Sequence, residues 1–244
     1  MNVLRRRAVV THREAATGES ISSVVSTGVL MAYRIKELFY TLQGEGRNAG
    51  RAAVFCRFSG CNLWSGREED RATAQCQFCD TDFVGTDGSG GGVFADADSL
   101  AAGVASTWQS SSAAASGRPF VVFTGGEPLL QMDEPLIAAV HAAGFEVAIE
   151  TNGTRLPPAG IDWVCVSPKA GSEFVLRSGD ELKLVFPQPG AEPDRFEDLA
   201  FGFFYLQPMD GPDATRNRQL AVEYCLAHPQ WRLSLQTHKL LGIR

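Results

Sequence analysis

The chain has 244 residues, of which 44% are hydrophobic and 20% are charged, so it is long enough to bury one sizeable core. Its net charge is −6 and its only dense basic run is the triplet Arg5 to Arg7, which argues against an extended nucleic-acid surface. We find no apolar run long enough to span a bilayer and no secretory signal core, so we expect a cytoplasmic protein with a small-molecule partner, no nucleic acid and no membrane.

The first part of the chain differs from the rest. Residues 1–30 lack an amphipathic period, so we expect a disordered N-terminal extension, followed by one catalytic domain over residues 31–244. The arginines would suit a transit peptide, whereas Glu14 and Glu19 weaken that interpretation. A true start at Met31 is an equal alternative.

Patterned sequence begins at Tyr33, and from there short apolar or β-branched runs recur as predicted strands: Ala53–Phe58, Phe120–Thr124, Phe145–Thr151, Trp163–Ser167, Glu181–Phe186, Phe203–Gln207 and Arg232–Gln236. Helical spacing is found between some of them, over Asp98–Gln109, Asp133–Ala143 and Ala214–Ala227. Strands that alternate with helices favour a parallel sheet or barrel, but these helices are too few for a complete eight-fold barrel.

We therefore expect an α/β fold, a partial, open (β/α) barrel with about six or seven strands and about three main helices. Two segments rich in small residues, Gly85–Gly92 and Ser110–Gly117, are predicted to be flexible connections within it.

Three cysteines carry the strongest chemical signal. Cys61, Cys76 and Cys79 form a C-x14-C-x2-C pattern that begins just after a predicted strand. A tetrahedral structural zinc site would need a fourth ligand, and no histidine lies nearby in the sequence, since the four are His12, His141, His228 and His238. Three protein ligands suit a four-iron cluster in which one iron stays open for another molecule. A zinc knuckle or ordinary cysteines remain the alternatives.

The other three cysteines lie inside apolar strand or helix patterns. We interpret Cys56, Cys165 and Cys225 as core residues.

A second motif follows the predicted strand that ends at Thr124. Gly125 and Gly126 allow the backbone to approach a ligand closely, and Pro128 stops the strand from continuing. Taken alone, the motif would be a turn into the next helix. Beside the cysteines, we interpret it as part of a binding site.

The cysteines, the aromatic Phe78 before the last of them, and Gly125–Pro128 together resemble the radical S-adenosylmethionine superfamily. The first interval, Asn62 to Gln75, is longer than the usual C-x3-C spacing. A lengthened interval is found in a subgroup of the 7-carboxy-7-deazaguanine synthase (QueE) family, which the chain resembles from Met31 to its C-terminus in the motifs Leu42–Gly46, Cys79–Thr81, Phe123–Pro128, Glu150–Gly153, Ser167–Lys169 and Gln207–Asp210.

The family resemblance implies a lyase that contracts 6-carboxy-5,6,7,8-tetrahydropterin to 7-carboxy-7-deazaguanine, with release of ammonia, in queuosine and deazapurine biosynthesis. It implies a [4Fe-4S] cluster, S-adenosyl-L-methionine and Mg2+ as cofactors. A pterin substrate, a reducing partner such as a flavodoxin-like protein, and a homodimer are implied by the same resemblance.

The resemblance also implies roles for individual residues. Cys61, Cys76 and Cys79 would hold the cluster, and Thr81 would bind magnesium. The cofactor contacts would be Phe78, Cys79, Asp80, Gly126, Ser167, Pro168, Lys169, Gln207, Pro208, Met209 and Asp210. The substrate contacts would be Leu42, Gln43, Gly44, Arg57, Thr124 and Arg244, with Glu45, Glu127 and His238 as further candidates.

Simpler roles and other functions compete with these. Thr81 could bond only the turn backbone, and Arg57 could be an exposed cation at a strand end. An activase that generates a glycyl radical on a partner protein would use the same cluster, although such enzymes normally keep the short cysteine spacing. A zinc-stabilised binding module is the alternative from another class.

Overall fold

The computed structural model describes residues 32–111 and 117–244. The expectations for residues 1–30 and Met31, and for most of Ser110–Gly117, therefore lie outside the described residues. Within the described part, no helix is long and apolar enough to cross a bilayer.

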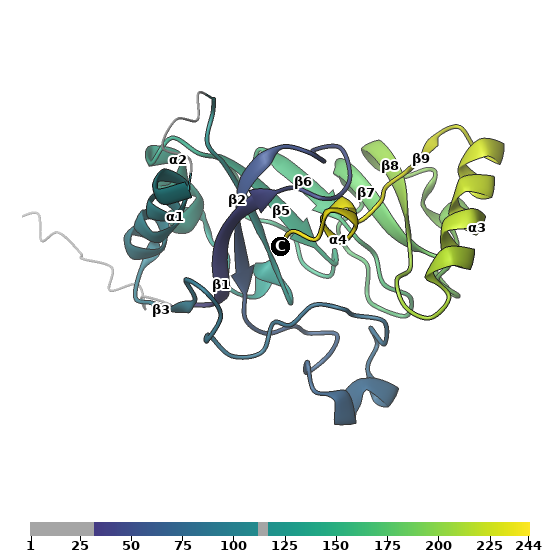
Figure 1. The fold of residues 1–244 in the computed structure, drawn as a ribbon, viewed down its shortest axis with the longest axis horizontal. Coiled ribbons are helices and arrows are strands. Elements are labelled where there is room, and N and C mark those ends of the chain that lie inside the picture. The colour runs from purple at the N-terminus through teal and green to yellow at the C-terminus, as the bar shows by residue number, and fades with distance from the viewer. Residues whose placement is uncertain (1–31, 112–116) are drawn as a thin grey trace, which may run out of the picture.

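The described part of the chain forms one nine-stranded sheet with few helices (Figure 1). Its strands are β1 (Tyr33–Leu42), β2 (Ala52–Phe58), β3 (Gly92–Phe94), β4 (Phe120–Gly125), β5 (Glu146–Thr151), β6 (Trp163–Val166), β7 (Ser178–Phe186), β8 (Ala200–Pro208) and β9 (Trp231–Leu233). Its α-helices are α1 (Ala97–Ser111), α2 (Glu134–Ala142), α3 (Ala214–Ala227) and α4 (Thr237–Leu241). The short 3-10 helices are η1 (Glu68–Thr73), η2 (Pro128–Leu130) and η3 (Pro193–Phe196).

The strand order is β3-β1-β2-β4-β5-β6-β7-β8-β9. From β2 to β9 every neighbouring pair is parallel, whereas β1 runs antiparallel to both β2 and β3. The outer strands β3 and β9 do not pair with each other, so the predicted open barrel is confirmed. The predicted strand number was too low, because β1 was not counted and β3 has only 3 residues.

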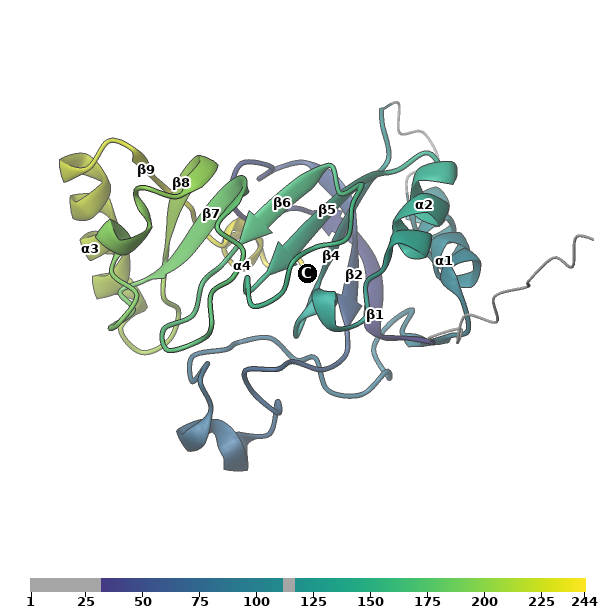
Figure 2. The ribbon, with the colours of Figure 1, turned by 180° about the vertical axis from the view of Figure 1, so that it is seen from behind.

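The three main helices lie at the two ends of the sheet. Figures 1 and 2 show α1 and α2 side by side at one end and α3 at the other, while the middle strands are uncovered behind. The connections from β5 to β6 and from β6 to β7 contain no helix. The prediction of three main helices is therefore confirmed, and the short α4 near the C-terminus is an addition to it.

Side chains alternate between the two faces of the strands, as pleated strands require. One face packs apolar residues under the helices, with Phe123 and Ile149 beside α1 and α2 and with Leu182 in a second cluster near α3. The opposite face presents Thr124, Glu150 and Lys183 to a cavity. The sheet thus separates an apolar core from a polar site.

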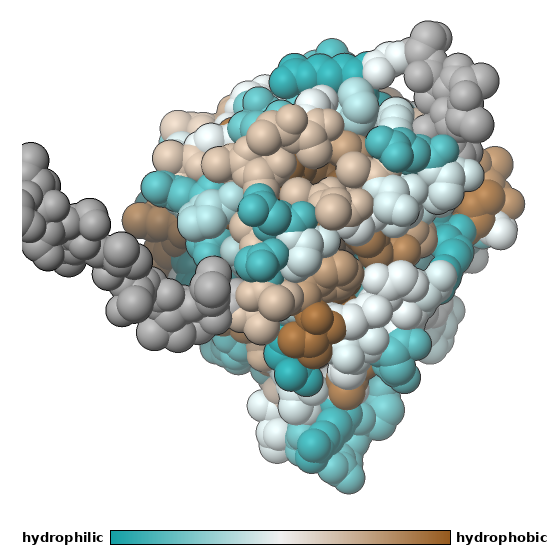
Figure 3. Space-filling model, turned by 90° about the vertical axis from the view of Figure 1, so that its left-hand side faces the viewer, coloured by the Kyte–Doolittle hydropathy of each residue, from teal (hydrophilic) through white to brown (hydrophobic). Residues whose placement is uncertain are grey.

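The connection between β2 and β3 extends away from the sheet and carries η1, which has no buried residue. This connection forms the lower part of the molecule in Figures 1 and 2. Seen from the side, hydrophilic residues gather at that lower tip (Figure 3). The long first cysteine interval is therefore a loop that carries a 3-10 helix and faces water at its tip.

The glycine-rich segment Gly85–Gly92 is a correction to the sequence prediction. It does not act as a flexible connection, because it is bonded along β1 through Leu38 N to Ser89 O at 2.8 Å and Gly88 N to Lys36 O at 2.9 Å. A Cβ at Gly88 would lie 2.6 Å from Lys36 O, so close backbone packing explains the glycine there.

The cysteines outside the cluster motif were predicted to be core residues. Cys56 is fully buried and Cys165 is 2% exposed, as expected. Cys225 is only half-buried, because α3 faces water on one side, although it still packs against the apolar cluster at that end.

Asp133 joins a helix start to the sheet. Its carboxylate accepts hydrogen bonds from Leu136 N at 3.0 Å and from the Tyr33 hydroxyl at 2.7 Å. The Asp133→Ala variant should lower the free energy of unfolding by about 1–2 kcal/mol, because it loses the helix cap and the acceptor for Tyr33. Urea unfolding followed by circular dichroism measures this, with Asp198→Ala in an exposed turn as the control that should change little. Equal stability of the two variants would contradict the capping role.

Candidate active site

A cavity of about 410 Å³ opens at the carboxyl ends of the parallel strands. Its lining comes from the segments that follow β2, β4, β5, β6 and β8, together with the end of β1 and the C-terminal segment. Ligands bind at this end of parallel sheets because loops from several strands converge there.

Most of the residues predicted from the sequence line this one cavity. They are Leu42, Gln43, Gly44, Glu45, Arg57, Cys61, Cys76, Phe78, Cys79, Asp80, Thr81, Thr124, Gly126, Ser167, Lys169, Gln207, Pro208, Met209, Asp210, His238 and Arg244. Two predicted contacts, Pro168 and Glu127, are not part of the lining.

The three motif cysteines lie at one part of the cavity. The Cys76 thiol donates a hydrogen bond to Cys79, which lowers the pKa of Cys79, while burial raises the pKa of Cys61. No group of three or more His, Cys, Asp or Glu side chains in residues 32–111 and 117–244 is placed to hold a single metal ion. A four-iron cluster binds each thiolate through a different iron, so its ligands need not meet at one point. A donor set of three sulfurs beside an open cavity fits that group.

The Gly125-Gly126 pair lets β4 pack against the segment that carries Cys61. Gly125 has a φ of 133°, and a Cβ there would lie 2.6 Å from Phe58 N. A Cβ at Gly126 would lie 2.9 Å from the Cβ of Cys61 and would also strike Gly60. Only glycine permits this approach, which explains why the two motifs occur together.

Glu127 does not face the cavity, which corrects the prediction that it contacts substrate. It is fully buried. Its carboxylate accepts hydrogen bonds from Thr151 Oγ1 at 2.7 Å, Asn152 N at 2.8 Å and Leu129 N at 3.0 Å. Glu127 therefore ties the loop after β4 to the end of β5. The carbonyl of Pro168 accepts a hydrogen bond from Gln188 Nε2 at 3.3 Å.

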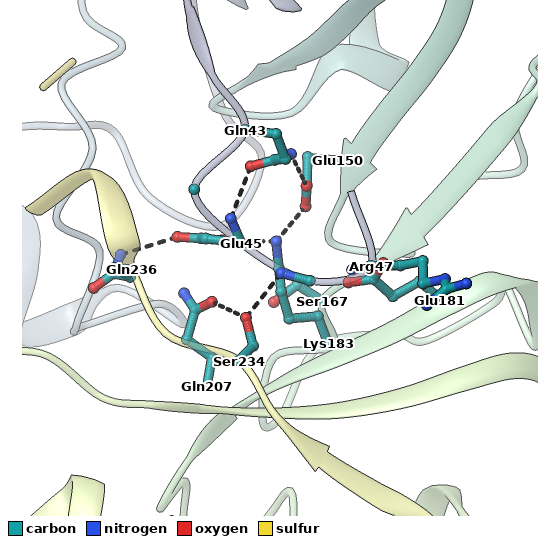
Figure 4. Close-up of polar contacts among 12 residues, drawn as sticks. Gln43, Glu45, Arg47, Glu150, Ser167, Glu181, Lys183, Gln207, Ser234 and Gln236 are labelled. Carbon is teal, nitrogen blue, oxygen red and sulfur yellow. Dashed lines mark hydrogen bonds and ion pairs between the residues drawn. The ribbon is translucent and has the colours of Figure 1, made fainter. Parts of the chain in front are cut away.

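A buried lysine organises the other side of the site (Figure 4). Lys183 Nζ lies 2.7 Å from Glu45 Oε2 and 2.8 Å from Glu150 Oε2, and the lysine side chain is only 5% exposed. Gln43 donates to Glu150 at 3.2 Å and accepts from Glu45 N at 3.1 Å. One cation therefore joins the segment after β1, the end of β5 and β7.

Lys183 keeps Glu45 ionised. Burial alone would raise the pKa of Glu45, but the charge and hydrogen bond of Lys183, with a hydrogen bond from Gln236, lower it to about 2. Burial opposes the charge on Lys183, yet Cys165 and the carboxylates of Glu150 and Glu45 raise its pKa well above the usual value. The cavity therefore holds an ionised Glu45, which can accept hydrogen bonds at neutral pH.

The C-terminal segment with α4 lies in front of the middle of the sheet in Figure 1, and its residues Gln236, His238, Lys239 and Arg244 line the cavity. Thr237 N donates to Gly44 O at 3.0 Å, and a Cβ at Gly44 would strike His238. Arg244 Nη2 lies 3.0 Å from Glu37 Oε2, and Arg57 Nε donates to Glu37 Oε1 at 2.8 Å. Arg57 is thus a partnered residue in the cavity rather than an exposed cation.

Lys239 fastens the same segment to the cysteine loop. Its Nζ lies 2.6 Å from Asp80 Oδ2 and 2.5 Å from Asp210 Oδ2. Two predicted cofactor contacts from distant parts of the chain therefore share one cation at the rim of the cavity.

Comparisons with known proteins agree with this geometry. No protein-family model matches the chain. The 7-carboxy-7-deazaguanine synthase of Bordetella pertussis is 66% identical over 213 residues, which cover 87% of this chain and 100% of the relative. The synthase of Caulobacter vibrioides is 65% identical over 216 residues, with 87% and 100% covered.

The chain belongs to the 7-carboxy-7-deazaguanine synthase family. The crystal structure of QueE from Escherichia coli superposes with a TM-score of 0.60 at 30% identity, covering 84% of this chain and 93% of that one. The open sheet with few helices is therefore the fold of this family of radical S-adenosylmethionine enzymes.

Several residues of the synthase cavity were not assigned from the sequence: Glu37, Glu150, Lys183, Gln236 and Lys239. Strand periodicity could have found one of them. Lys183 stands between Leu182 and Leu184 in a predicted strand. Alternation therefore places it on the face opposite to these two apolar residues, together with Glu181. Glu150 opens the quoted motif Glu150–Gly153, but no side chain in the sequence marks it as the partner of a lysine.

The Lys183→Met variant should lower the free energy of unfolding by about 3 kcal/mol at neutral pH, because it leaves two carboxylates without their buried cation. Glu45 has a lowered pKa, so its contribution to wild-type stability is present above the ordinary value of 4.5 and is lost as the pH falls toward about 2. The deficit should therefore shrink in acid. Urea titrations at several pH values measure it.

Lys239→Met is the matched control, because Lys239 also bridges two carboxylates but its side chain is 37% exposed. It should cost less than about 1 kcal/mol. Equal losses in the two variants, or a pH-independent deficit in Lys183→Met, would contradict the buried-cation account.

Proposed function

We propose that this chain contracts 6-carboxy-5,6,7,8-tetrahydropterin to 7-carboxy-7-deazaguanine, with release of ammonia, in queuosine and deazapurine biosynthesis. The observation that carries the proposal is the sharing of one cavity by the three motif cysteines and the carboxylates bridged by Lys183. The cysteines would hold the cluster that starts a radical reaction. The carboxylates would accept hydrogen bonds from a heterocycle rich in N–H donors.

On the cysteine side, Cys61, Cys76 and Cys79 would hold a [4Fe-4S] cluster. Such a cluster, when bound, supplies the electron that cleaves S-adenosyl-L-methionine and gives the radical that removes a substrate hydrogen. Gly126 lies against the cysteine segment and would leave room for the cofactor. Lys169 Nζ donates to Ser167 O at 2.6 Å and Ser167 Oγ at 2.7 Å, so it is held in place at the cavity wall.

Further cofactor contacts would come from the residues on either side of the cluster loop and after β8. These are Phe78, Asp80, Gln207, Pro208, Met209 and Asp210.

On the carboxylate side, Glu45 and Glu150 would accept hydrogen bonds from the amino and ring N–H groups of the pterin. An ionised carboxylate has only acceptor oxygens, which suits N–H donors of a ligand. Arg57 carries the opposite charge and would pair with the substrate carboxylate. Gln43, Gly44, Leu42, Thr124 and Arg244 would complete the substrate pocket.

Thr81 would bind Mg2+ through its hydroxyl oxygen, together with substrate oxygens and water. Magnesium prefers such hard ligands and usually keeps several waters. Thr81 lines the cavity two residues after Cys79, which supports this assignment.

We further propose a cytoplasmic homodimer that receives its electrons from a flavodoxin-like protein. The family resemblance supports these points.

Mass spectrometry of the products tests the reaction directly. We expect 7-carboxy-7-deazaguanine after the anaerobically reconstituted protein is incubated with S-adenosyl-L-methionine, reductant, magnesium and 6-carboxytetrahydropterin. Formation of 5′-deoxyadenosine without that product would reject the substrate but not the radical chemistry. Neither product from protein with a full complement of iron and sulfide would reject both.

The Cys76→Ala variant should lose cleavage of S-adenosyl-L-methionine while keeping its fold, because one of the three thiolates is missing. Measured 5′-deoxyadenosine should fall below detection, whereas Cys225→Ala on α3 should keep the wild-type rate. Retained cleavage in Cys76→Ala would reject the ligand assignment.

The Thr81→Ala variant should lose activity mainly at limiting magnesium, because its hydroxyl would no longer bind the ion. Product formation is measured against magnesium concentration, and the half-saturating concentration should rise several-fold. An unchanged magnesium dependence would leave Thr81 as a residue that only bonds the turn.

A further inference from the structure

One side chain in the long cysteine interval, Arg71, has a hydrogen bond at each of its three nitrogens. Arg71, in η1, donates through Nη1 to Gln77 O at 2.8 Å and to Cys79 O at 3.0 Å. Its Nε and Nη2 bind the two carboxylate oxygens of Glu68 at 2.7 Å and 2.5 Å. The planar guanidinium is thereby fixed on the segment that runs from Cys76 to Cys79.

The same guanidinium stacks on an aromatic wall of the cavity. Its central carbon lies 4.1 Å from the centre of the Trp64 ring. Trp64 packs edge-on against Phe83 with ring centres 5.6 Å apart, and its indole N–H donates to Arg67 O at 3.1 Å. Both aromatic residues line the cavity, so Arg71 connects the exposed tip of the interval to its wall.

The rest of the interval is anchored at its two ends. Asn62 accepts from Asn152 Nδ2 at 3.0 Å, and Gln75 donates to Gly171 O at 2.8 Å. Between these anchors, Arg71 is the side chain that turns back onto the last two cysteines. The interval is therefore long enough to place a cation against the backbone of the segment from Cys76 to Cys79.

Arg71 also lies beside the proposed cluster ligands, because its Nη1 donates to the backbone carbonyl of Cys79 at 3.0 Å. A cation near iron–sulfur ligands favours the reduced, more negative state of a cluster.

We infer that Arg71 is the positioning residue of the cluster-binding segment, which clamps Cys76–Cys79 through its backbone carbonyls and raises the reduction potential of the bound cluster. This inference rests on the proposed [4Fe-4S] cluster. The role of the long cysteine interval is then to carry Arg71, which holds the backbone of Cys76–Cys79.

Three variants of the reconstituted holoenzyme separate the parts of this role. Arg71→Gln removes the charge and the forked donors, and Arg71→Lys keeps the charge but loses the planar fork and the stacking. Arg67→Gln is the matched control in the same interval, because Arg67 has a side chain 70% exposed and lies 3.9 Å from Glu69.

Two quantities are measured besides activity. One is the rate at which iron is lost to a chelator, and the other is the midpoint potential of the cluster from an electron paramagnetic resonance titration. Circular dichroism of each variant confirms that the fold is kept.

We expect Arg71→Gln to lose iron several-fold faster than the wild type and to have a more negative midpoint potential, while Arg67→Gln matches the wild type in both. Arg71→Lys should lose iron faster but keep the wild-type potential. Wild-type values of either quantity in Arg71→Gln, or a potential in Arg71→Lys as negative as that of Arg71→Gln, would overturn the inference.

Failure of this inference is distinguishable from failure of the proposed function. If the Arg71 variants match the wild type and the wild type still forms 7-carboxy-7-deazaguanine, only the role of Arg71 is rejected. If the wild type binds no iron and sulfide at all, the proposed function fails first.

Discussion

The ion pairs of Lys183 with Glu45 and Glu150 are the constraint on which the carboxylate side of the cavity depends. Three separate segments meet at this one cation, and the lysine side chain is 5% exposed. A buried charge is costly unless it is paired, so the carboxylates hold the lysine in place as much as the lysine holds them. Gln43 and Gln236 then bind the same carboxylates and fix their orientation.

The cysteine side depends on a different kind of constraint, which is steric. Gly125 and Gly126 let β4 pack against the segment of Cys61. Glu127 next to them accepts from three donors, which are Leu129 N in η2 and Thr151 and Asn152 at the end of β5. The Gly-Gly-Glu-Pro motif thus combines close backbone packing at its two glycines with a buried acceptor at Glu127.

The fold was largely predictable because strand periodicity and helix spacing are local properties. The parallel strands, the three main helices and the open arrangement all followed from such patterns. The antiparallel β1 and the packed Gly85–Gly92 segment did not, because their conformation depends on neighbours far along the chain. A glycine-rich sequence is typical both of a loose linker and of close backbone packing, and only the contacts with Lys36 and Leu38 decide between them.

The sequence by itself determined the chemistry of this protein: the spacing of three cysteines, the motifs at strand ends and the family to which they belong. Only the tertiary structure decided which side chains lie in contact with one another around the cavity. Gln43 meets Glu150 across 107 positions, and Thr41 donates to Arg244 O across 203. It also decided that Glu127 is buried and that Arg57 pairs with Glu37. The reason is physical. Two charged side chains far apart in the sequence become neighbours only after the chain has folded, and local sequence patterns do not show which pairs will meet.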